Sequence, residues 1–206
     1  MTPMPRLGEH PWLGAYAAPT VTPGGGSASA VAAALGCALL AMAARIGGRK
    51  AERQRERLQW LADEAERLRG ALVEQERADA GVYERMVATV RAARATAGDP
   101  GAERAAASAR ADATDVPLVT AELAAEGLAL AEELASIGLA RTVSDQLVAA
   151  HLLRAALEGG IATVSYNLGR LAEGEVRDQL MGRLRRLEAA RRTAVHLIDR
   201  LTGLVE

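Results

Sequence analysis

The chain has 206 residues, half of them hydrophobic, which suits one domain with a real core. Phe is absent and only two Trp and three Tyr occur, so Ala and Leu must supply most of the buried surface, a composition typical of closely packed helices. The net charge of −1, with acids and bases mixed along the chain, argues against a nucleic-acid partner, and the single cysteine, Cys37, excludes an intramolecular disulfide.

Hydrophobic spacing and helix-stop residues divide the chain into one short and five long helical segments, and no segment alternates as a strand would. The expected helices cover roughly residues 7–17, 27–48, 50–97, 100–139, 142–172 and 174–204. Ser27 is a preferred N-cap and Gly48 a preferred stop for the second helix. Pro117 should kink or split the fourth, because proline removes a helical donor and clashes with the preceding turn. Long helices with short connections predict one all-α domain over residues 1–206, an antiparallel bundle of five long helices plus a short N-terminal one.

The segment from Thr20 to Ala44 carries no charge, and its helical part is near the length of a membrane span. It consists mostly of Ala, Gly and Ser, however, so we expect the central helix of a bundle, packed on all sides. The first residues show no basic stretch followed by an apolar one. We therefore expect a cytoplasmic protein with no membrane partner.

Asp79 lies where the pattern of the third helix requires an apolar residue. Apolar positions recur at intervals of seven up to Leu72, and the next step lands on Asp79. An acid on the core-facing stripe costs free energy unless it is paired, solvated or functional. The structural explanations are an ion pair with Arg77 or Arg85, or a stripe that has drifted out of register. The functional explanation is chemistry by a buried carboxylate.

The fifth helix carries two further polar features. Asn167 lies among apolar residues beyond Gly159-Gly160, and glycines there are tolerated where another backbone or a ligand comes close. The structural explanation is close helix packing with Asn167 bonded across it. At the start of the same helix, capping by Ser144 or Thr142 and compensation of the helix dipole by Asp145 account for these residues without chemistry.

A glycine-rich turn precedes the second helix and is the sharpest single signal. Its residues are Pro23, Gly24, Gly25, Gly26 and Ser27. Backbone N–H groups without neighbouring side chains can approach a ligand closely, and a helix N-terminus favours a carboxylate or phosphate. The turn is not a Walker A loop, since no Lys follows, nor a dinucleotide-binding fingerprint, since no strand precedes it. By itself it is also compatible with a tight corner between packed elements.

Other reactive side chains indicate no site of their own. Cys37 lies on the small-residue helix and should be buried and inert. The histidines His10, His151 and His196 are widely separated and lack metal-ligand spacing, so we expect no metal. The Arg-rich stretch 45–69 should be a solvated helix face with Glu partners.

These features together resemble the cyclodeaminase/cyclohydrolase family of tetrahydrofolate enzymes. That family includes the cyclodeaminase half of formiminotransferase-cyclodeaminase and stand-alone bacterial methenyltetrahydrofolate cyclohydrolases. The matching segments, in the family's order, are TPGGGSASAVAAALGCALLAM from Thr22, ADAGVYERMV from Ala78, DVPLVTAE from Asp115, and SDQLVAAHLLRAALEGG followed by NL from Ser144 to Leu168.

The resemblance implies an all-helical homodimer that holds a folate near the dimer interface and needs no cofactor besides this substrate. Asp79 and, second to it, Asp145 are the candidate catalytic groups, because a buried carboxylate can transfer protons or stabilise positive charge. The remaining positions that match the family's motifs are candidate substrate contacts: Pro23, Gly24, Gly25, Gly26, Ser27, Tyr83, Pro117, Ser144 and Asn167.

Two departures from the family's pattern stand out. The family often has Gly-Asn shortly before the Ser-Asp pair, where this chain has Leu139, and an aromatic after the basic residues that follow the second helix, where this chain has Ala51. A straight helix also separates Asp145 from Asn167 by about 33 Å. The two residues therefore serve different parts of an extended ligand, or a second subunit brings copies together, or one of them is structural.

The resemblance implies chemistry at the N5/N10 bridge of tetrahydrofolate. The leading interpretation is formimidoyltetrahydrofolate cyclodeaminase, which releases ammonia and forms 5,10-methenyltetrahydrofolate. The alternative is 5,10-methenyltetrahydrofolate cyclohydrolase, in which water adds to the same bridge. A third interpretation is a catalytically silent folate-binding or helical interaction protein, supported mainly by Leu139.

Overall fold

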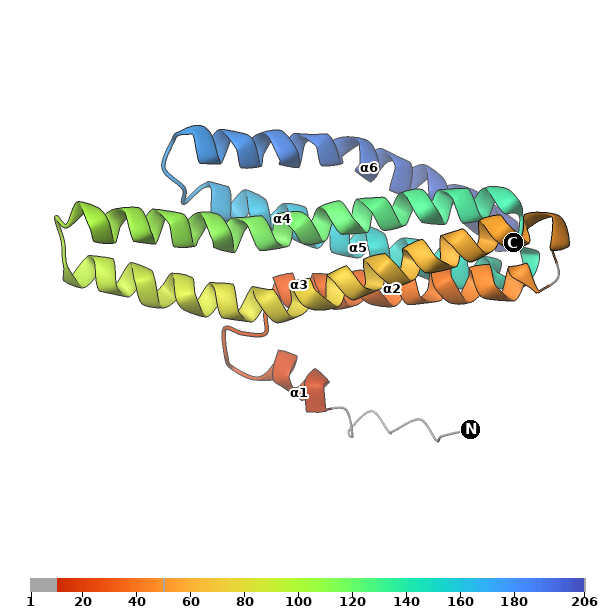
Figure 1. The fold of residues 1–206 in the computed structure, drawn as a ribbon, viewed down its shortest axis with the longest axis horizontal. Coiled ribbons are helices and arrows are strands. Elements are labelled where there is room, and N and C mark those ends of the chain that lie inside the picture. Colours follow the sequence, from red (N-terminus) through yellow and green to blue (C-terminus); the bar gives the residue numbers. More distant parts are fainter. Residues whose placement is uncertain (1–10, 50, 206) are drawn as a thin grey trace.

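The computed structural model describes residues 11–49 and 51–205, and within these ranges every regular element is helical (Figure 1). The α-helices are α1 (Pro11–Ala17), α2 (Gly25–Gly48), α3 (Arg55–Ala95), α4 (Pro100–Ile137), α5 (Val143–Leu168) and α6 (Glu175–Val205). Two 3₁₀ turns, η2 (Glu52–Gln54) and η3 (Ala140–Thr142), precede α3 and α5. The predicted all-α class with one short and five long helices is confirmed, while the expected helix start at residues 7–10 and Lys50 lie outside the described residues.

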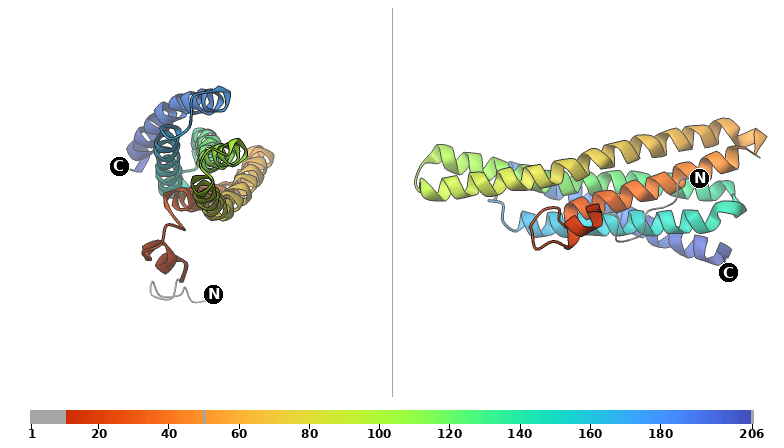
Figure 2. Two further views of the ribbon diagram at one scale, coloured as in Figure 1. Left: turned by 90° about the vertical axis from the view of Figure 1, so that its left-hand side faces the viewer. Right: turned by 90° about the horizontal axis from the view of Figure 1, so that it is seen from below.

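Helices α2 to α5 form an antiparallel bundle, which Figure 2 shows end-on and from below. The start of α2 contacts the later part of α3 through Ser27 and Asp79, and the end of α2 contacts the early part of α3 through Arg45 and Glu66. Helix α6 packs on α4 and α5 and is the fifth long helix of the predicted bundle. Short connections enforce this up-and-down order.

The core consists of Ala and Leu, as the composition predicts, with α2 against α3, α4 and α5. Missing side chains let these helices approach closely. A Cβ added at Gly36 would lie 2.9 Å from Leu153 Cγ, and one at Gly127 would lie 2.7 Å from Leu153 Cδ2. Glycine at both positions therefore makes room for one leucine, in an interior too dense to accept extra methyl groups without strain.

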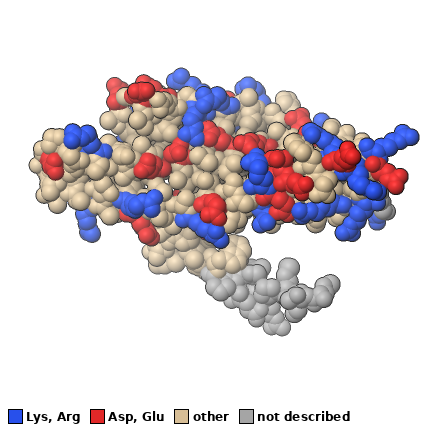
Figure 3. Space-filling model, in the orientation of Figure 1, with Lys and Arg blue, Asp and Glu red and all other residues tan. Residues whose placement is uncertain are grey.

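Two segments, Gly25–Gly48 and Ala140–Leu168, are by length and composition alone apolar enough to cross a membrane. Both are built into the bundle, where each packs against three other long helices or more. The helices around them are strongly charged, and Figure 3 shows acidic and basic side chains interspersed over the face in view. The predicted role of residues 20–44 as a central bundle helix agrees with this packing.

Helices α3 and α4 are longer than their neighbours and project beyond them as a two-helix arm, seen at the left of Figure 1. The last buried residue of α3 is Val82. The heptad-like spacing continues to Met86 and Val90, but these side chains are only partly buried because α2 and α5 do not reach the arm. Spacing alone therefore overestimates how far the core extends.

The helices differ from expectation at two places, the start of α2 and the proline inside α4. Helix α2 begins two residues earlier than predicted, its N-cap is Gly24, and Ser27 lies inside its first turn. Helix α4 passes through Pro117 without a break. Asp99 caps α4, because its Oδ1 accepts a hydrogen bond of 2.8 Å from the backbone N–H of Gly101.

Candidate functional site

Asp79 is bound to the first turn of α2. One of its oxygens, Oδ2, accepts hydrogen bonds from the backbone N–H of Ser27 at 2.9 Å and from the Ser27 hydroxyl at 2.8 Å. The first N–H groups of a helix have no partner within the helix and carry partial positive charge, so a carboxylate suits this position. The expected ion pair with Arg77 or Arg85 is not found among the described residues, and Arg77 bonds Glu74 instead. The partner of Asp79 is thus the glycine turn itself.

Gly26 makes the approach of Asp79 possible. A Cβ at this position would lie 2.3 Å from Asp79 Oδ1 and 2.8 Å from its Cγ. A side chain here would displace the carboxylate, whereas a Cβ at Gly25 would meet nothing within 4 Å. Asp79 Oδ1 makes no hydrogen bond to any described residue, so one carboxylate oxygen is hydrogen-bonded and the other, called the open oxygen below, is not. A carboxylate held in this way can act as a proton acceptor.

Pro117 and Asn167 act together across α4 and α5. Proline has no N–H, so the carbonyl of Ala113, four residues earlier in α4, loses its helical donor. Asn167 Nδ2 donates a hydrogen bond of 3.1 Å to that carbonyl. The expectation that Asn167 is bonded across a close helix packing is confirmed, and the contact explains how α4 continues through a buried proline.

The glycine pair before Asn167 lies against two different helices. A Cβ at Gly159 would lie 2.4 Å from Ser29 Oγ of α2, and one at Gly160 would lie 2.8 Å from the carbonyl oxygen of Pro117 in α4. The pair thus brings the start of α2, the proline region of α4 and the end of α5 to one level of the bundle. Close packing, the structural explanation, is what the structure shows here.

Tyr83 extends this level toward the arm. It follows Asp79 by one helical turn on α3 and lines a cavity of about 90 Å³ with Met86, Arg110, Thr114 and Asn167, among others. The cavity accommodates a single small group rather than a whole extended ligand. Two arginines, Arg110 and Arg170, also line it, and they could meet a carboxylate. The structure thus brings the glycine turn, Asp79, Tyr83, Pro117 and Asn167 to one end of the four-helix core.

Ser144 and Asp145 lie elsewhere. Both are in the first turn of α5, at the end of the bundle where α2 finishes. Gly159, which faces the start of α2, is 14 positions further along the same unbroken helix, so Asp145 lies roughly 21 Å from that level. Of the two predicted caps, Thr142 holds the N-cap position, although its side chain makes no capping bond. One chain therefore does not unite the two predicted catalytic carboxylates.

Leu139 replaces the family's asparagine next to this second group. Its side chain packs onto α2, because a Cβ at Gly47 would lie 2.5 Å from Leu139 Cδ1. Nearby, the Gln146 side chain is buried and donates hydrogen bonds to the carbonyl of Leu139 at 3.4 Å and to the Thr142 hydroxyl at 3.1 Å. An apolar contact thus occupies the place of the expected polar one.

Tyr16 is a candidate that the sequence patterns did not single out. It lies on α1, and its buried hydroxyl has no hydrogen-bond partner among the described residues. Burial, followed by the negative charges of Glu76 and Asp79, raises the pKa of the Tyr16 hydroxyl above its usual value. The charge of the candidate carboxylate Asp79 therefore acts on the Tyr16 phenol. The only sequence signal was the rarity of aromatic residues.

The other reactive side chains contribute no site. Cys37 is fully buried, as predicted, and burial chiefly raises the pKa of its thiol to about 12. Within residues 11–49 and 51–205 no group of three or more His, Cys, Asp or Glu side chains could hold a metal ion. His10 lies outside those ranges, while His151 and His196 are exposed. The candidate site therefore consists of Asp79, the glycine turn 23–27, and the contact between the Pro117 region of α4 and Asn167 of α5.

The sequence profile of the formiminotransferase-cyclodeaminase family matches residues 10–186, most of the chain. The chain belongs to this family. Its fold is similar to the crystal structure of formiminotetrahydrofolate cyclodeaminase from Thermotoga maritima, with a TM-score of 0.84, 24% sequence identity, and coverage of 98% of each chain. At that identity the likeness shows the fold. No match is found among curated proteins.

Proposed function

We propose that this family member is a tetrahydrofolate one-carbon enzyme, specifically a formimidoyltetrahydrofolate cyclodeaminase. The observation that carries the proposal is the Asp79 carboxylate, with Oδ2 fixed by Ser27 and Oδ1 open beside Gly26. Family membership supplies the substrate class. The name of the Thermotoga maritima protein, which has the same fold, favours the deaminase. Such an enzyme works in the cytoplasm without a metal or cofactor.

In the proposed reaction, N10 of the folate attacks the formimino carbon attached to N5. The N10 proton moves to the exocyclic nitrogen, and a second proton from solvent turns that nitrogen into a leaving ammonia. The C–N bond then breaks, ammonia departs, and the methenyl bridge keeps the positive charge. Asp79 Oδ1 carries the proton from N10 to the leaving nitrogen and afterwards faces the cationic bridge.

The surrounding residues position the folate in this proposal. The backbone of residues 23–27 contacts a polar part of the ligand at the start of α2. Tyr83 and Asn167 line the cavity one turn beyond Asp79, and Arg110 and Arg170 are available for a folate carboxylate. Pro117 acts through Asn167, because it leaves the Ala113 carbonyl for Asn167 to bond.

The alternative activity, methenyltetrahydrofolate cyclohydrolase, uses the same open oxygen. Asp79 Oδ1 would orient a water molecule that adds to the cationic bridge, and the N5–C bond would then break to give the 10-formyl compound. The two reactions differ only in the nucleophile that reaches one carbon. The apolar packing of Leu139 on Gly47 supports the third interpretation, a catalytically silent folate binder. Folate binding without either reaction would refute both activities.

We further propose that the active unit is a homodimer. Helix α2 is uncharged over most of its length, yet Leu35 on it is 53% exposed, and an apolar groove of about 360 Å³ runs along α2 and α3. A two-fold axis near the middle of α2 would set the start of one α2 against the end of its partner. That arrangement brings Asp145 of one chain toward Asp79 of the other.

Two assays with purified protein test the activity. Loss of the near-ultraviolet band of methenyltetrahydrofolate indicates the hydrolase, whereas growth of that band from formiminotetrahydrofolate, with ammonia release, indicates the deaminase. Asp79→Asn keeps an oxygen that can accept from Ser27 but removes the proton acceptor, so we expect turnover to fall at least about 10²-fold with unchanged folding. Asp112→Asn, the same change at an exposed position of α4, is the control. Undiminished turnover by Asp79→Asn, or no reaction with either folate, would refute the proposal.

A further inference from the structure

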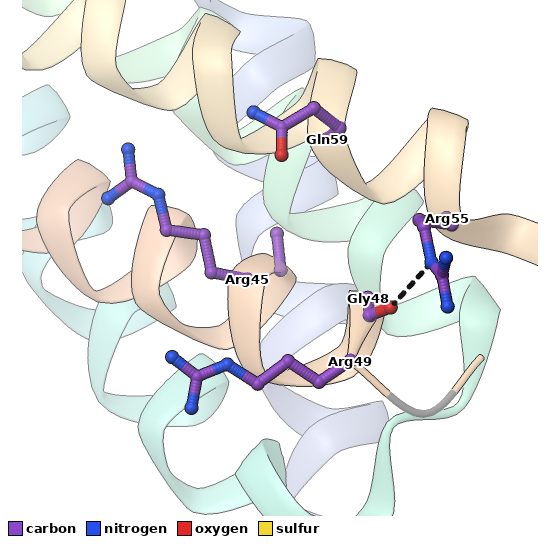
Figure 4. Close-up of a pocket in the computed structure, with 6 residues that line it drawn as sticks. Arg45, Gly48, Arg49, Arg55 and Gln59 are labelled. Atoms are coloured by element: carbon purple, nitrogen blue, oxygen red, sulfur yellow. Dashed lines mark hydrogen bonds between the residues drawn. The ribbon is translucent and has the colours of Figure 1, made fainter. Parts of the chain in front are cut away.

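The opposite end of α2 carries a basic pocket of about 470 Å³. Its walls are Arg45, Gly48 and Arg49 near the end of α2, and Arg55 and Gln59 near the start of α3, together with Ala44. Figure 4 shows Arg45 and Arg49 extended in the same direction along α2, with Gln59 facing them from α3. Since α2 spans 24 residues, about 36 Å separates this pocket from the glycine turn.

The chain concentrates positive charge around this pocket. Between positions 45 and 57 it has six basic residues and two acidic ones, a local excess of four positive charges in a chain whose net charge is −1. Further along α3, Arg67 and Arg69 are paired with glutamates, as predicted for a solvated helix face. The excess is therefore local to the turn between α2 and α3.

The arginines of the pocket are incompletely satisfied. Arg45 donates to Glu66 at 2.9 Å, but Glu66 also accepts from Arg69 at 2.6 Å, and these two arginines lower the pKa of the Glu66 carboxyl. Arg55 makes a long contact of 3.4 Å to the carbonyl of Gly48 and an ion pair of 3.7 Å with Glu52. The Arg49 side chain makes no hydrogen bond or ion pair to any described residue. Each guanidinium has five N–H donors, so most of the donors in the pocket have no acceptor among the described residues.

A purely structural role explains only part of this cluster. Cations near the last turn of a helix offset its dipole, which accounts for the contact between Arg55 and Gly48. The same effect favours Arg45 in the last turn of α2 and Arg49 at its C-cap, although like charges one turn apart repel each other. It does not require a hollow lined by three guanidinium groups and a side-chain amide.

We propose that this pocket binds a small multivalent oxyanion, a ligand that carries two or more phosphate or carboxylate groups. Guanidinium groups match both kinds of group through paired N–H donors, and several charged oxygens are needed to satisfy three arginines at once. The pocket is a single hollow beside the acids Glu52, Asp63 and Glu66, which favours a compact anion over a long polyanion. Within one chain the pocket lies at the far end of α2 from Asp79, although the homodimer proposed above would set it beside the partner's glycine turn. Its test uses neither a folate nor turnover, so it can fail or succeed independently of the proposed function.

Isothermal titration calorimetry of the full chain at low salt tests the proposal with two probes, inorganic pyrophosphate and citrate. We expect saturable binding of at least one probe, and the comparison distinguishes phosphate from carboxylate ligands. The double variant Arg49→Gln/Arg55→Gln should weaken binding at least about tenfold, since it removes two of the three guanidinium groups. The matched control Arg53→Gln/Arg94→Gln removes the same charge from exposed positions that do not line the pocket.

The control variant should bind within about twofold of the unaltered protein, and unchanged circular dichroism and melting temperature should show that both variants fold. Three outcomes would overturn the proposal. The first is that neither probe binds saturably. The second is that the control variant weakens binding as much as the pocket variant, which would indicate diffuse electrostatic attraction. The third is that the correctly folded pocket variant binds as tightly as the unaltered protein.

Discussion

At the scale of single residues, the absence of one methyl group at Gly26 shapes the candidate site. Asp79 comes so close to the α2 backbone that a Cβ at Gly26 would overlap its carboxylate, 2.3 Å from Oδ1. The same approach lets Ser27 donate twice to Oδ2. Three glycines precede Ser27, but only Gly26 faces the carboxylate, so the three are not equivalent.

Alanine at Gly26 should therefore destabilise the protein, whereas alanine at Gly25 should not. We expect Gly26→Ala to lower the free energy of unfolding by about 1–3 kcal/mol, as for other overpacked sites. Displacement of Asp79 should also reduce folate turnover by roughly 10²-fold. Gly25→Ala, whose Cβ meets nothing within 4 Å, should leave the free energy of unfolding within experimental error or slightly raise it. Urea unfolding and turnover measure the two effects, and equal behaviour of the two variants would contradict this account of the turn.

At the scale of helices, α4 and α5 are joined by a side chain that replaces a missing backbone bond. Pro117 deprives the Ala113 carbonyl of its helical donor, and Asn167 of α5 supplies one at 3.1 Å. A buried carbonyl without a donor costs free energy, so the two residues are energetically coupled although they belong to different helices.

A double-mutant cycle measures that coupling. Asn167→Ala alone should cost about 1–3 kcal/mol, because the Ala113 carbonyl then has no partner. In a Pro117→Ala background a backbone N–H returns to α4 and bonds that carbonyl, so Asn167→Ala should cost at least about 1 kcal/mol less. Urea unfolding of the four proteins gives the coupling energy. Additive costs within about 0.5 kcal/mol would show that Asn167 acts independently of Pro117.

The helices themselves could be predicted from local sequence, because their signals are local. Apolar spacing, Asp99-Pro100 and Gly48 fixed most boundaries to within a few residues. The start of α2 could not be predicted in this way, because its partner is Asp79 of another helix. The passage of α4 through Pro117 likewise depends on Asn167, 50 positions away. Contacts between helices determine both features.

The candidate site could be predicted only in part for the same reason. Asp79 stands out in the sequence because it breaks an apolar stripe, and the glycine turn stands out because three glycines precede a helix. That the two contact each other follows from the packing of α2 on α3, which spacing does not specify. The sequence does not single out Tyr16, and the Arg-rich stretch 45–69 predicts only a solvated helix face, so the pocket around Arg49 is not expected from it. Both features arise from tertiary packing.

At the scale of the whole molecule, the two groups of family residues lie at opposite ends of one bundle. The glycine turn, Asp79, Tyr83, Pro117 and Asn167 lie toward one end, whereas Asp145 in the first turn of α5 is roughly 21 Å from Gly159 and roughly 33 Å from Asn167 along the helix. Helix α2 connects the two ends and exposes apolar side chains such as Leu35 between them. A second copy packed antiparallel along α2 would cover that face and complete two composite sites.

Subunit complementation decides whether such a composite site exists. Asp79→Asn and Asp145→Asn should each be nearly inactive, yet a refolded equal mixture should recover about a quarter of the unaltered activity, because half the dimers are mixed and each has one intact site. Light scattering should give a mass of twice the 21.5 kDa chain. Each variant refolded alone, at the same total concentration, is the control. A mixture that stays inactive although mixed dimers form, or an Asp145→Asn protein that is fully active by itself, would show that each chain works with Asp79 alone.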